Sequence, residues 1–401
     1  MYIIYEKLKI KRVLLFHGYE ICNNTLNIFS DSIAACFKRK NIEVGFINLN
    51  AEGNGLAEEY IREINKGFDV AIAFNSSGQH ETTMDGINVF EYMNVPFYNW
   101  LLDHPCEHAE DILSDVKNYH VICLDRDHVN FVRRYFPNVK GAHFIPLGGY
   151  CQNFEHSFES FTGRKHDVVF TGSVFSLEEL GSIISALPSQ TRRVAVDMIE
   201  YMIDNRSCTN EEALRYALSN NQINAGREEL REYAFLTRKT NPYVRTYIRL
   251  ELLQYLAQSG LKIDLFGTGW EALESKGNMI LHGAISYKDS VKLCTDSKIC
   301  LNVMPLFKDG LHDRIPTAML GGAAVMTDGS RYIEQTFVPA GDTCELYIYD
   351  INRPELVSEQ ITALLMNPYR LYNVAENGFK KAQQSMTWDE RVDELIDLLE
   401  S

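Results

Sequence analysis

Residues 306–328 combine charged side chains and a short apolar helix in a way that suits binding of an anion. In LFKDGLHDRIPTAMLGGAAVMTD, His312, Asp313 and Arg314 directly precede an apolar run, which ends at a Gly-Gly pair and continues as a strand. Asp313 fits the N-cap of this helix, and Pro316 fits its first turn. Free amides and partial positive charge at a helix start attract anions, and His312 and Arg314 add donors. The pattern predicts a metal-free site for a leaving diphosphate, while an ordinary surface junction explains the residues about equally well.

Two further pairs of polar residues could act on a hydroxyl group or on a metal ion. Asp103 and His104 end a strand-like run, and a carboxylate or an imidazole can accept the proton of an acceptor hydroxyl. A turn before Pro105 is the structural alternative.

Asp125 and Asp127 follow an apolar run and are similar to the metal-binding Asp-x-Asp of GT-A glycosyltransferases. Because Asp127 also fits the N-cap of the next helix, we expect no metal site there.

Short β-rich runs alternate with amphipathic segments, which predicts parallel βαβ units. The expected strands of the first half are 12–16, 44–49, 69–74, 95–102, 119–124 and 142–147. Those of the second half are 166–175, 261–267, 278–283, 298–304, 323–327 and 344–350. Residues 176–245 show no convincing strand and predict a helical insertion, which an amphipathic helix over 248–260 follows.

These elements predict an α/β fold of two Rossmann-like domains that face each other across a cleft, with a helical insertion in the second domain. We expect an N-terminal domain over 1–155 and a C-terminal domain over 160–385, which includes the insertion 176–245. A final helix over 386–401 could brace the first domain. Ligands of such sheets bind beyond the carboxyl ends of the strands. Gly18, after the first strand, would let a ligand approach the backbone there.

Composition restricts the classes of partner. A chain of 401 residues with 39 Lys plus Arg against 54 Asp plus Glu has a net charge of -15, which disfavours nucleic acid and anionic lipid. The nine Cys form no Cys-x-x-Cys pair, so neither a disulfide framework nor a zinc site is expected. The sequence shows no signal peptide and no spanning apolar run. We therefore expect a cytoplasmic protein, free or peripheral to the inner face of the membrane, whose oligomeric state is open.

The order of several motifs resembles the C-terminal domain of GT-B nucleotide-sugar glycosyltransferases. These motifs are FTGSV (170–174), DLFGTGW (264–270), the stretch 278–305 and GLHDRIPTAMLGGAAVMTD (310–328). In particular the chain is similar to the bacterial "glycosyltransferase family 1" type with spore-maturation-protein-like C-terminal domains, most strongly over 260–395. The resemblance implies a metal-independent, hexosyl-type glycosyltransferase of bacterial surface glycan biosynthesis. It implies a UDP-sugar or GDP-sugar donor, an acceptor hydroxyl in a glycan, glycolipid or protein, and no separate cofactor.

The residue patterns and the resemblance together give candidate residues. The catalytic candidates, from the patterns described above, are Asp103, His104, His312 and Arg314, with the acceptor on the N-terminal domain. The resemblance implies contacts to the nucleotide base from the loop 283–287, contacts to the phosphates from the loop 171–173, and a close backbone approach to the donor at Gly267. The nucleotide-sugar candidates are Gly18, Thr171, Gly172, Ser173, Gly267, Gly283, Ala284, Ile285, Ser286, Tyr287, Asp309, Gly310 and Thr317.

The chain departs from the resemblance at two of these positions. Many retaining relatives carry Glu where this chain has Asp309 and Thr317. A threonine cannot accept hydrogen bonds from a ribose in the bidentate way of a carboxylate. Two alternatives therefore stay open: a non-catalytic GT-B glycosylation partner or chaperone, and a sugar-nucleotide epimerase or phosphorylase.

Overall fold

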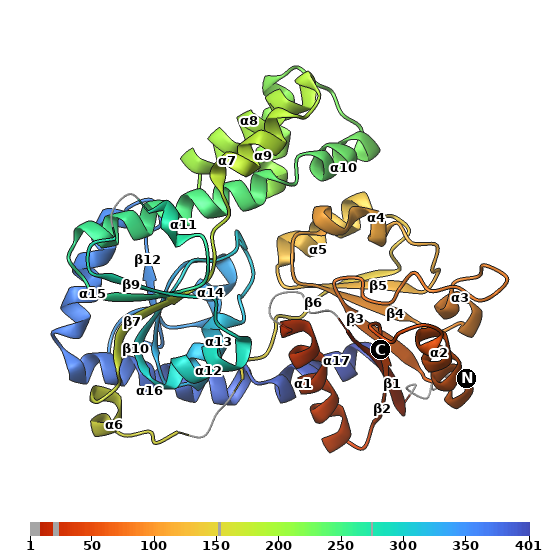
Figure 1. The fold of residues 1–401 in the computed structure, drawn as a ribbon, viewed down its shortest axis with the longest axis horizontal. Helices are drawn as coiled ribbons and strands as arrows, with labels where there is room; N and C mark the ends of the chain where they lie inside the picture. The colour runs from red at the N-terminus through yellow and green to blue at the C-terminus, as the bar shows by residue number, and fades with distance from the viewer. Residues whose placement is uncertain (1–8, 19–23, 151–153, 274–275) are drawn as a thin grey trace, which may run out of the picture. The chain divides into compact units, whose positions relative to one another are not determined.

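The chain folds into two compact units, each built on a parallel sheet (Figure 1). The computed structural model describes residues 9–18, 24–150, 154–273 and 276–401. Unit 1 comprises Met1–Gly148 and Trp388–Ser401, and unit 2 comprises Gly149–Thr387. Each sheet has six strands, and helices flank both sheets, which confirms the predicted α/β class of two Rossmann-like units.

The sheet of unit 1 has the strand order β2-β1-β3-β4-β5-β6, with every neighbouring pair parallel. The two central strands, β3 and β4, are buried at every position, as expected of strands covered on both faces. The strands are β1 Arg12–His17, β2 Glu43–Asn48, β3 Val70–Phe74, β4 Phe97–Leu101, β5 Tyr119–Cys123 and β6 Gly141–Phe144. The helices are α1 Thr25–Arg39, α2 Gly55–Lys66, α3 Val89–Met93, α4 Ala109–Ile112, α5 Arg126–Tyr135 and α17 Trp388–Leu399.

The last helix, α17, packs against the first helix of the same unit. The ring of Trp388 lies 5.4 Å from that of Phe29, and Asp389 pairs with Arg39 at 2.7 Å. The Trp388 side chain is buried, whereas the Arg39–Asp389 pair is exposed and contributes less than about 1 kcal/mol. Apolar contact therefore holds the end of the chain on unit 1.

The sheet of unit 2 has the strand order β12-β11-β10-β7-β8-β9, again parallel throughout. Its strands are β7 His166–Thr171, β8 Ile263–Phe266, β9 Met279–Gly283, β10 Ser297–Asn302, β11 Ala324–Asp328 and β12 Tyr347–Tyr349. The helices outside the insertion are α6 Phe158–Thr162, α12 Tyr287–Thr295, α13 Arg314–Leu320, α14 Arg331–Thr336, α15 Val357–Leu365 and α16 Pro368–Ser385. The carboxyl ends of β7, β10 and β11 lie side by side and define the edge where a ligand is expected.

The helical insertion follows β7 and consists of α7 Leu177–Ser185, α8 Ser189–Asp204, α9 Asn210–Asn220 and α10 Arg227–Leu236. In Figure 1, α7, α8 and α9 lie on the far side of α11 from the sheet of unit 2. The predicted break near residue 245 is wrong, because α11 runs without interruption over Thr240–Gln258. Pro242 falls in the first turn of α11, where proline is tolerated.

Candidate functional site

The helix predicted after His312 exists, but its start is capped differently from the prediction. Helix α13 begins at Arg314, and the preceding Asp313 has helical dihedral angles (φ -57, ψ -24) and makes no side-chain cap. Instead, the backbone amide of Arg314 donates to Nδ1 of His312 at 3.2 Å. Burial, together with the neighbouring Arg314 and Arg249, lowers the pKa of His312 well below its usual value. His312 is therefore a neutral cap residue whose Nδ1 is an acceptor, and not the cationic donor that the sequence suggested.

Asp313 and Thr317 line a small cavity, together with Thr171 and Arg314. The cavity measures about 30 Å³, enough for a water molecule but not for a sugar. Tyr287 lies against both Asp313 and Thr317, and burial raises the pKa of the Asp313 carboxyl. Thr317 is 5% exposed, and its hydroxyl accepts from the amide of Tyr150 at 3.4 Å. In the structure Thr317 therefore has an internal packing role.

Three arginines gather at the carboxyl edge of the unit 2 sheet. Arg314 begins α13, while Arg245 and Arg249 lie one turn apart on α11. Burial and the positive charges of Arg314 and Arg245 lower the pKa of Arg249. Burial and the charge of Arg245 also lower the pKa of Arg314, and the negative charge of Asp313 partly counteracts this lowering.

These three cations lack the partners that buried charges normally have. Arg249 is 5% exposed, and its Nη1 donates to the carbonyl of Ser173 at 2.8 Å. Its Nε, and Nη1 of Arg314, are buried without a hydrogen-bond acceptor. Within the described ranges, none of the three has a carboxylate at ion-pair distance. A cluster of this kind is stabilised when an anion binds among the guanidinium groups.

The loop Thr171–Ser173 borders this arginine cluster. A Cβ atom on Gly172 would lie 3.2 Å from Nη1 of Arg314, so the absence of a side chain keeps the guanidinium close to the loop backbone. Gly267 has a φ of +134, and a Cβ there would lie 1.8 Å from the Gly172 carbonyl oxygen. The close approach at Gly267 is thus between two chain segments, where the sequence suggested an approach of the donor. Ser173 accepts from the amide of Thr268 at 3.0 Å, which ties the two segments together.

The predicted base loop, 283–287, joins β9 to α12. Gly283 and Ala284 are exposed, and Gly283 has a φ of +73 with no atom near its Cβ position. Ser286 caps α12 by accepting from the amide of Asp289 at 3.1 Å, and Ile285 is half-buried. The carbonyl of Gly283 accepts from the amide of Gly267 at 2.7 Å, so the loop is tied to the segment after β8, while Tyr287 points into the small cavity.

Asp309 and Gly310 belong to the segment before α13. Asp309 lies 3.5 Å from Nε of Arg331, and the carbonyl of Gly310 accepts from the Ser330 hydroxyl at 2.7 Å. Both residues therefore contact the start of α14, and the structure gives Asp309 a protein partner in place of a free carboxylate.

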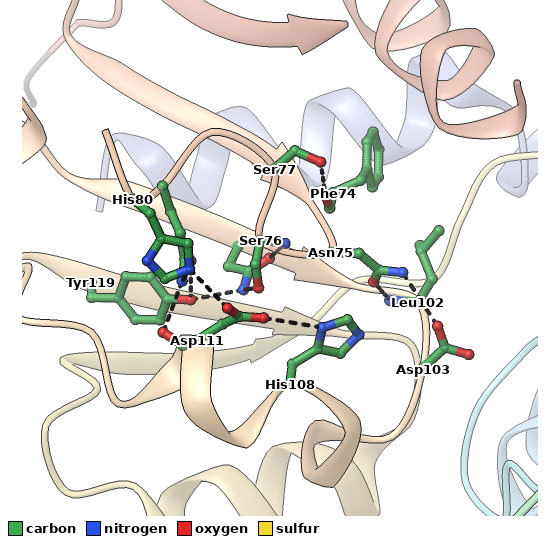
Figure 2. Close-up of polar contacts among 12 residues, drawn as sticks. Phe74, Asn75, Ser76, Ser77, His80, Leu102, Asp103, His108, Asp111 and Tyr119 are labelled. Atoms are coloured by element: carbon green, nitrogen blue, oxygen red, sulfur yellow. Dashed lines mark hydrogen bonds and ion pairs between the residues drawn. The ribbon is translucent and has the colours of Figure 1, made fainter. Parts of the chain in front are cut away.

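Polar residues also gather at the carboxyl edge of unit 1 (Figure 2). Asp103 is exposed, and its Oδ2 accepts from the side-chain amide of Asn75 at 3.2 Å. The Oδ1 atom of Asn75 accepts from the amide of Leu102 at 2.8 Å, so this side chain bridges the ends of β3 and β4. His104 caps the following 3-10 turn, Pro105–His108, through its Nδ1. Of the predicted pair, Asp103 thus presents its carboxylate to solvent, whereas His104 is a cap residue.

The loop 75–78, which follows β3, is the start of a buried network. Asn75 and Ser76 have φ values of 45 and 65, in the left-handed region. The side-chain amide of Asn99 donates to the hydroxyls of Ser76 at 2.8 Å and of Tyr119 at 2.7 Å. The Tyr119 hydroxyl in turn donates to Gln79 at 2.9 Å. Figure 2 shows this network supporting the loop that carries Asn75.

Two other predicted positions have structural explanations. Gly18 has a φ of +118, and a Cβ there would lie 2.8 Å from the amide nitrogens of Leu49 and Asn50. Asp125, and not Asp127, caps α5, because its buried carboxylate accepts from the amide of Asp127 at 2.7 Å. The Asp-x-Asp pattern therefore begins a helix. In the described ranges no group of three or more His, Cys, Asp or Glu residues is arranged to hold a metal, and no helix is long and apolar enough to cross a membrane.

The sequence interpretation missed Arg249. A signal was present, because Arg249 shares a helix face with the apolar residues Leu252, Leu253 and Leu256, all buried. A charged residue on a buried stripe requires a partner, and its partner, the Ser173 carbonyl, lies 76 positions away in sequence.

Comparison with known proteins supports a relation to sugar transferases. Residues 245–397, which carry all three arginines, match the family model described as "Glycosyl transferase-like". No curated protein sequence matches the chain. The finer likeness to spore-maturation-protein-like domains stays a prediction.

Several solved structures share the fold over nearly the whole chain. Sucrose-phosphate synthase from Thermosynechococcus elongatus has a TM-score of 0.52 at 11% identity, covering 97% of this chain and 98% of that one. Anabaena Alr3699/HepE in complex with UDP-glucose has a TM-score of 0.52 at 12% identity, covering 97% and 99%. An alpha-glucosyltransferase in complex with UDP and a 13-mer DNA has a TM-score of 0.56 at 10% identity, covering 98% and 100%. Each unit of this chain thus has the Rossmann-like architecture found in GT-B glycosyltransferase structures.

Proposed function

We propose that the protein is a glycosyltransferase that moves a sugar from a UDP-sugar or GDP-sugar to an acceptor hydroxyl. The observation that carries this proposal is the cluster of Arg245, Arg249 and Arg314 at the carboxyl edge of unit 2, which has no carboxylate at ion-pair distance among the described residues. A diphosphate supplies the missing negative charge and matches the planar donors of guanidinium groups. The match of residues 245–397 to a glycosyl transferase-like family supports the same substrate class.

Within this proposal the arginines act on the leaving group. The bond between the anomeric carbon and the diphosphate oxygen breaks, and its electron pair remains on the diphosphate. Arg314 and Arg249 stabilise the charge that develops there, which makes a divalent ion unnecessary for this step. Exposed backbone at Gly283 and Ala284 would bind the base.

Unit 1 would supply the acceptor groups. The acceptor oxygen forms the new bond to the anomeric carbon, and its proton passes to a carboxylate. Asp103 suits this role because it is exposed and because Asn75 fixes its orientation. His104 suits it less, since its Nδ1 is engaged in the cap. We place the reaction in the assembly of a bacterial surface glycan, following the resemblance in the sequence.

One observation favours a second candidate, a non-catalytic protein that binds a nucleotide sugar for a partner enzyme. The carboxylate of Asp309 is paired with Arg331, and Thr317 carries only a buried hydroxyl, so neither position offers a free carboxylate to a ribose or a sugar. Such a protein would keep the diphosphate site but would not turn the donor over.

Calorimetric titration with UDP, GDP and ADP, followed by turnover assays with UDP-sugars and GDP-sugars, tests the proposal. We expect binding of UDP or GDP, and slow donor hydrolysis without acceptor. The variant Arg314→Ala should lower turnover by about 10²-fold, the effect of losing one transition-state donor. Absence of nucleoside diphosphate binding would refute the proposal, whereas binding without turnover of any donor would favour the non-catalytic candidate.

A further inference from the structure

A concave surface lies in unit 1 between the end of α5, the turn that follows it and β6. Its volume is about 370 Å³, within the range of small-molecule sites. We call it the β6 groove, and its charged or titratable side chains are those of Arg133, Lys140 and His143. The lining, which lies wholly within the described residues, contains no Asp or Glu, although carboxylates outnumber cations in the chain.

Two imidazole rings meet beside the β6 groove because residue 141 is a glycine. Nδ1 of His120, in β5, lies 3.4 Å from Nε2 of His143, in β6. A Cβ atom on Gly141 would lie 2.8 Å and 2.5 Å from these two nitrogen atoms, so a larger residue would displace the rings. Nε2 of His120 lies 3.1 Å from Oδ1 of Asn118, which can only accept. Nδ1 of His120 is therefore the acceptor, and Nε2 of His143 is the donor.

This chain of hydrogen bonds leaves Nδ1 of His143 for a ligand, since it has no hydrogen-bond partner among the described residues. The groups that face the two rings are cationic or neutral. Burial and the charge of Arg133 lower the pKa of His143, and burial, His143 and Lys140 lower the pKa of His120 to about 4. The ring of Tyr98 stacks on His120 at 4.4 Å. An anion in the groove would offset this repulsion, and a proton on Nδ1 of His143 would then be donated to it.

The two cations of the β6 groove are also available to a ligand. Nη2 of Arg133 donates to the carbonyl of Ala142 at 2.8 Å, which holds the guanidinium against β6. In the part of the chain that the structure describes, neither Arg133 nor Lys140 has a carboxylate at ion-pair distance. Arg134 lies in the same last turn of α5 but does not line the groove. Guanidinium, ammonium and imidazolium groups together match the several oxygen atoms of a phosphate.

We propose that the β6 groove binds a phosphate group, with Arg133, Lys140 and protonated His143 as its donors. The ligand is a phosphate ester, either a soluble small molecule or the headgroup of a lipid. Gly141 begins β6, so this site lies at the amino end of the strand, whereas Asp103 follows the carboxyl end of β4. The inference is independent of the proposed sugar transfer, which uses the carboxyl edges of the sheets.

NMR of protein labelled with ¹³Cε1-histidine tests the inference, because the His143 signal reports on the β6 groove alone. The variant His143→Gln identifies this signal by its loss. Saturating UDP is present throughout, to occupy the arginine cluster of unit 2. We expect inorganic phosphate and sulfate to shift the His143 signal. Sulfate keeps both charges between about pH 8 and about pH 6, so its affinity should rise as the pH falls, because only His143 gains a proton.

Variants of the lining test the role of each donor. Arg133→Gln and Lys140→Gln should each bind phosphate about tenfold more weakly, the effect of losing one charged hydrogen bond. In His143→Gln, calorimetric titration should show a sulfate affinity that no longer depends on pH. Arg134→Gln is the matched control, because it removes the same charge from the same turn of α5 outside the groove. Its phosphate affinity should equal that of the wild type, and thermal unfolding should show that all variants remain folded.

Further probes distinguish the two sources of phosphate. A shift of the His143 signal with glycerol 3-phosphate would indicate a soluble ester. A shift with vesicles of phosphatidylcholine and phosphatidylglycerol, but not with phosphatidylcholine alone, would indicate a lipid headgroup. Absence of a shift with every phosphate-bearing probe would overturn the inference, as would equal weakening in Arg133→Gln and Arg134→Gln. A shift with Zn²⁺ alone would also overturn it and would make the imidazole pair a metal site.

Discussion

Replacing Arg249 by methionine should stabilise the unliganded protein while it abolishes diphosphate binding. Arg249 is 5% exposed, its charge is opposed by Arg314 and Arg245, and one hydrogen bond to Ser173 offsets this cost. Burial of an ion costs several kcal/mol after relaxation, and a charged hydrogen bond returns about 1.5–3 kcal/mol. Methionine keeps most of the side-chain volume without the charge. We therefore expect the free energy of unfolding to rise by about 2 kcal/mol.

Calorimetric melting and nucleotide titration together check this prediction. For a unit of this size, about 2 kcal/mol corresponds to a rise in Tm of roughly 4–8 °C. UDP at 100 times its Kd should stabilise the wild type by about 2.7 kcal/mol and should leave the variant unchanged. The unliganded variant should thus melt above the unliganded wild type, but UDP should raise the melting temperature of the wild type alone.

Arg227→Met serves as the control, because Arg227 is exposed at the start of α10 and should affect neither quantity. A variant Arg249→Met that melts lower than the wild type and still binds UDP with full affinity would refute the reasoning. Arg249 would then be an anchor for the loop at Ser173, and the cluster would carry no functional information.

Three further predictions follow from other buried groups. Arg164→Met should lower the free energy of unfolding of unit 2 by about 3 kcal/mol, because the buried guanidinium donates to four main-chain carbonyls, those of Cys294, Ser297, Gly321 and Gly322. Urea titrations measure this loss, and an unchanged unfolding midpoint would contradict it. Burial lowers the pKa of His128 to about 3, below the unfolded value of about 6.5, so its contribution to stability is complete above pH 6.5 and falls by about 3 kcal/mol at pH 4. Urea titrations between pH 7.5 and pH 4 measure this loss, which His128→Phe should reduce. Asp125→Ala should lower the free energy of unfolding by about 1 kcal/mol through loss of the α5 cap. The nucleotide affinity of the wild type should be equal with and without a chelator. A loss of affinity in the chelator that manganese alone restores would favour the Asp-x-Asp metal site instead.

The strand framework could be predicted because its physical signal is local. The apolar run VAIAF becomes β3, and the mostly apolar run AVMTD becomes β11, and both strands are buried at every position. The short helix α13 was also predictable, since the Gly-Gly pair that ends it needs one residue with positive φ. Gly322 has a φ of +67 and donates to the carbonyl of Met319.

Side-chain roles at the site were less predictable, because they depend on contacts between distant segments. Asp313 and His312 are adjacent, and the residue preferences of helix caps favour Asp313. In the fold, however, Asp313 lies against Tyr287, and the amide of Arg314 donates to His312. The loop at Ser76 is polar in sequence, yet Ser76 is buried. Its hydrogen-bond partners, Asn99 and Tyr119, come from other strands of the sheet.

The contrast between Arg164 and Arg249 shows how a buried cation can be assigned to the fold or to a ligand. Both are buried arginines of unit 2, and burial lowers the pKa of both. Arg164 donates four hydrogen bonds to main-chain carbonyls from three segments, so the fold itself solvates its charge. The Nε atom is buried without a partner in both arginines, but Arg249 donates only one hydrogen bond and faces two further cations. In a chain of net charge -15, where carboxylates outnumber cations, these three arginines have no carboxylate at ion-pair distance among the described residues, and this is the basis for proposing that a bound molecule supplies negative charge at this site.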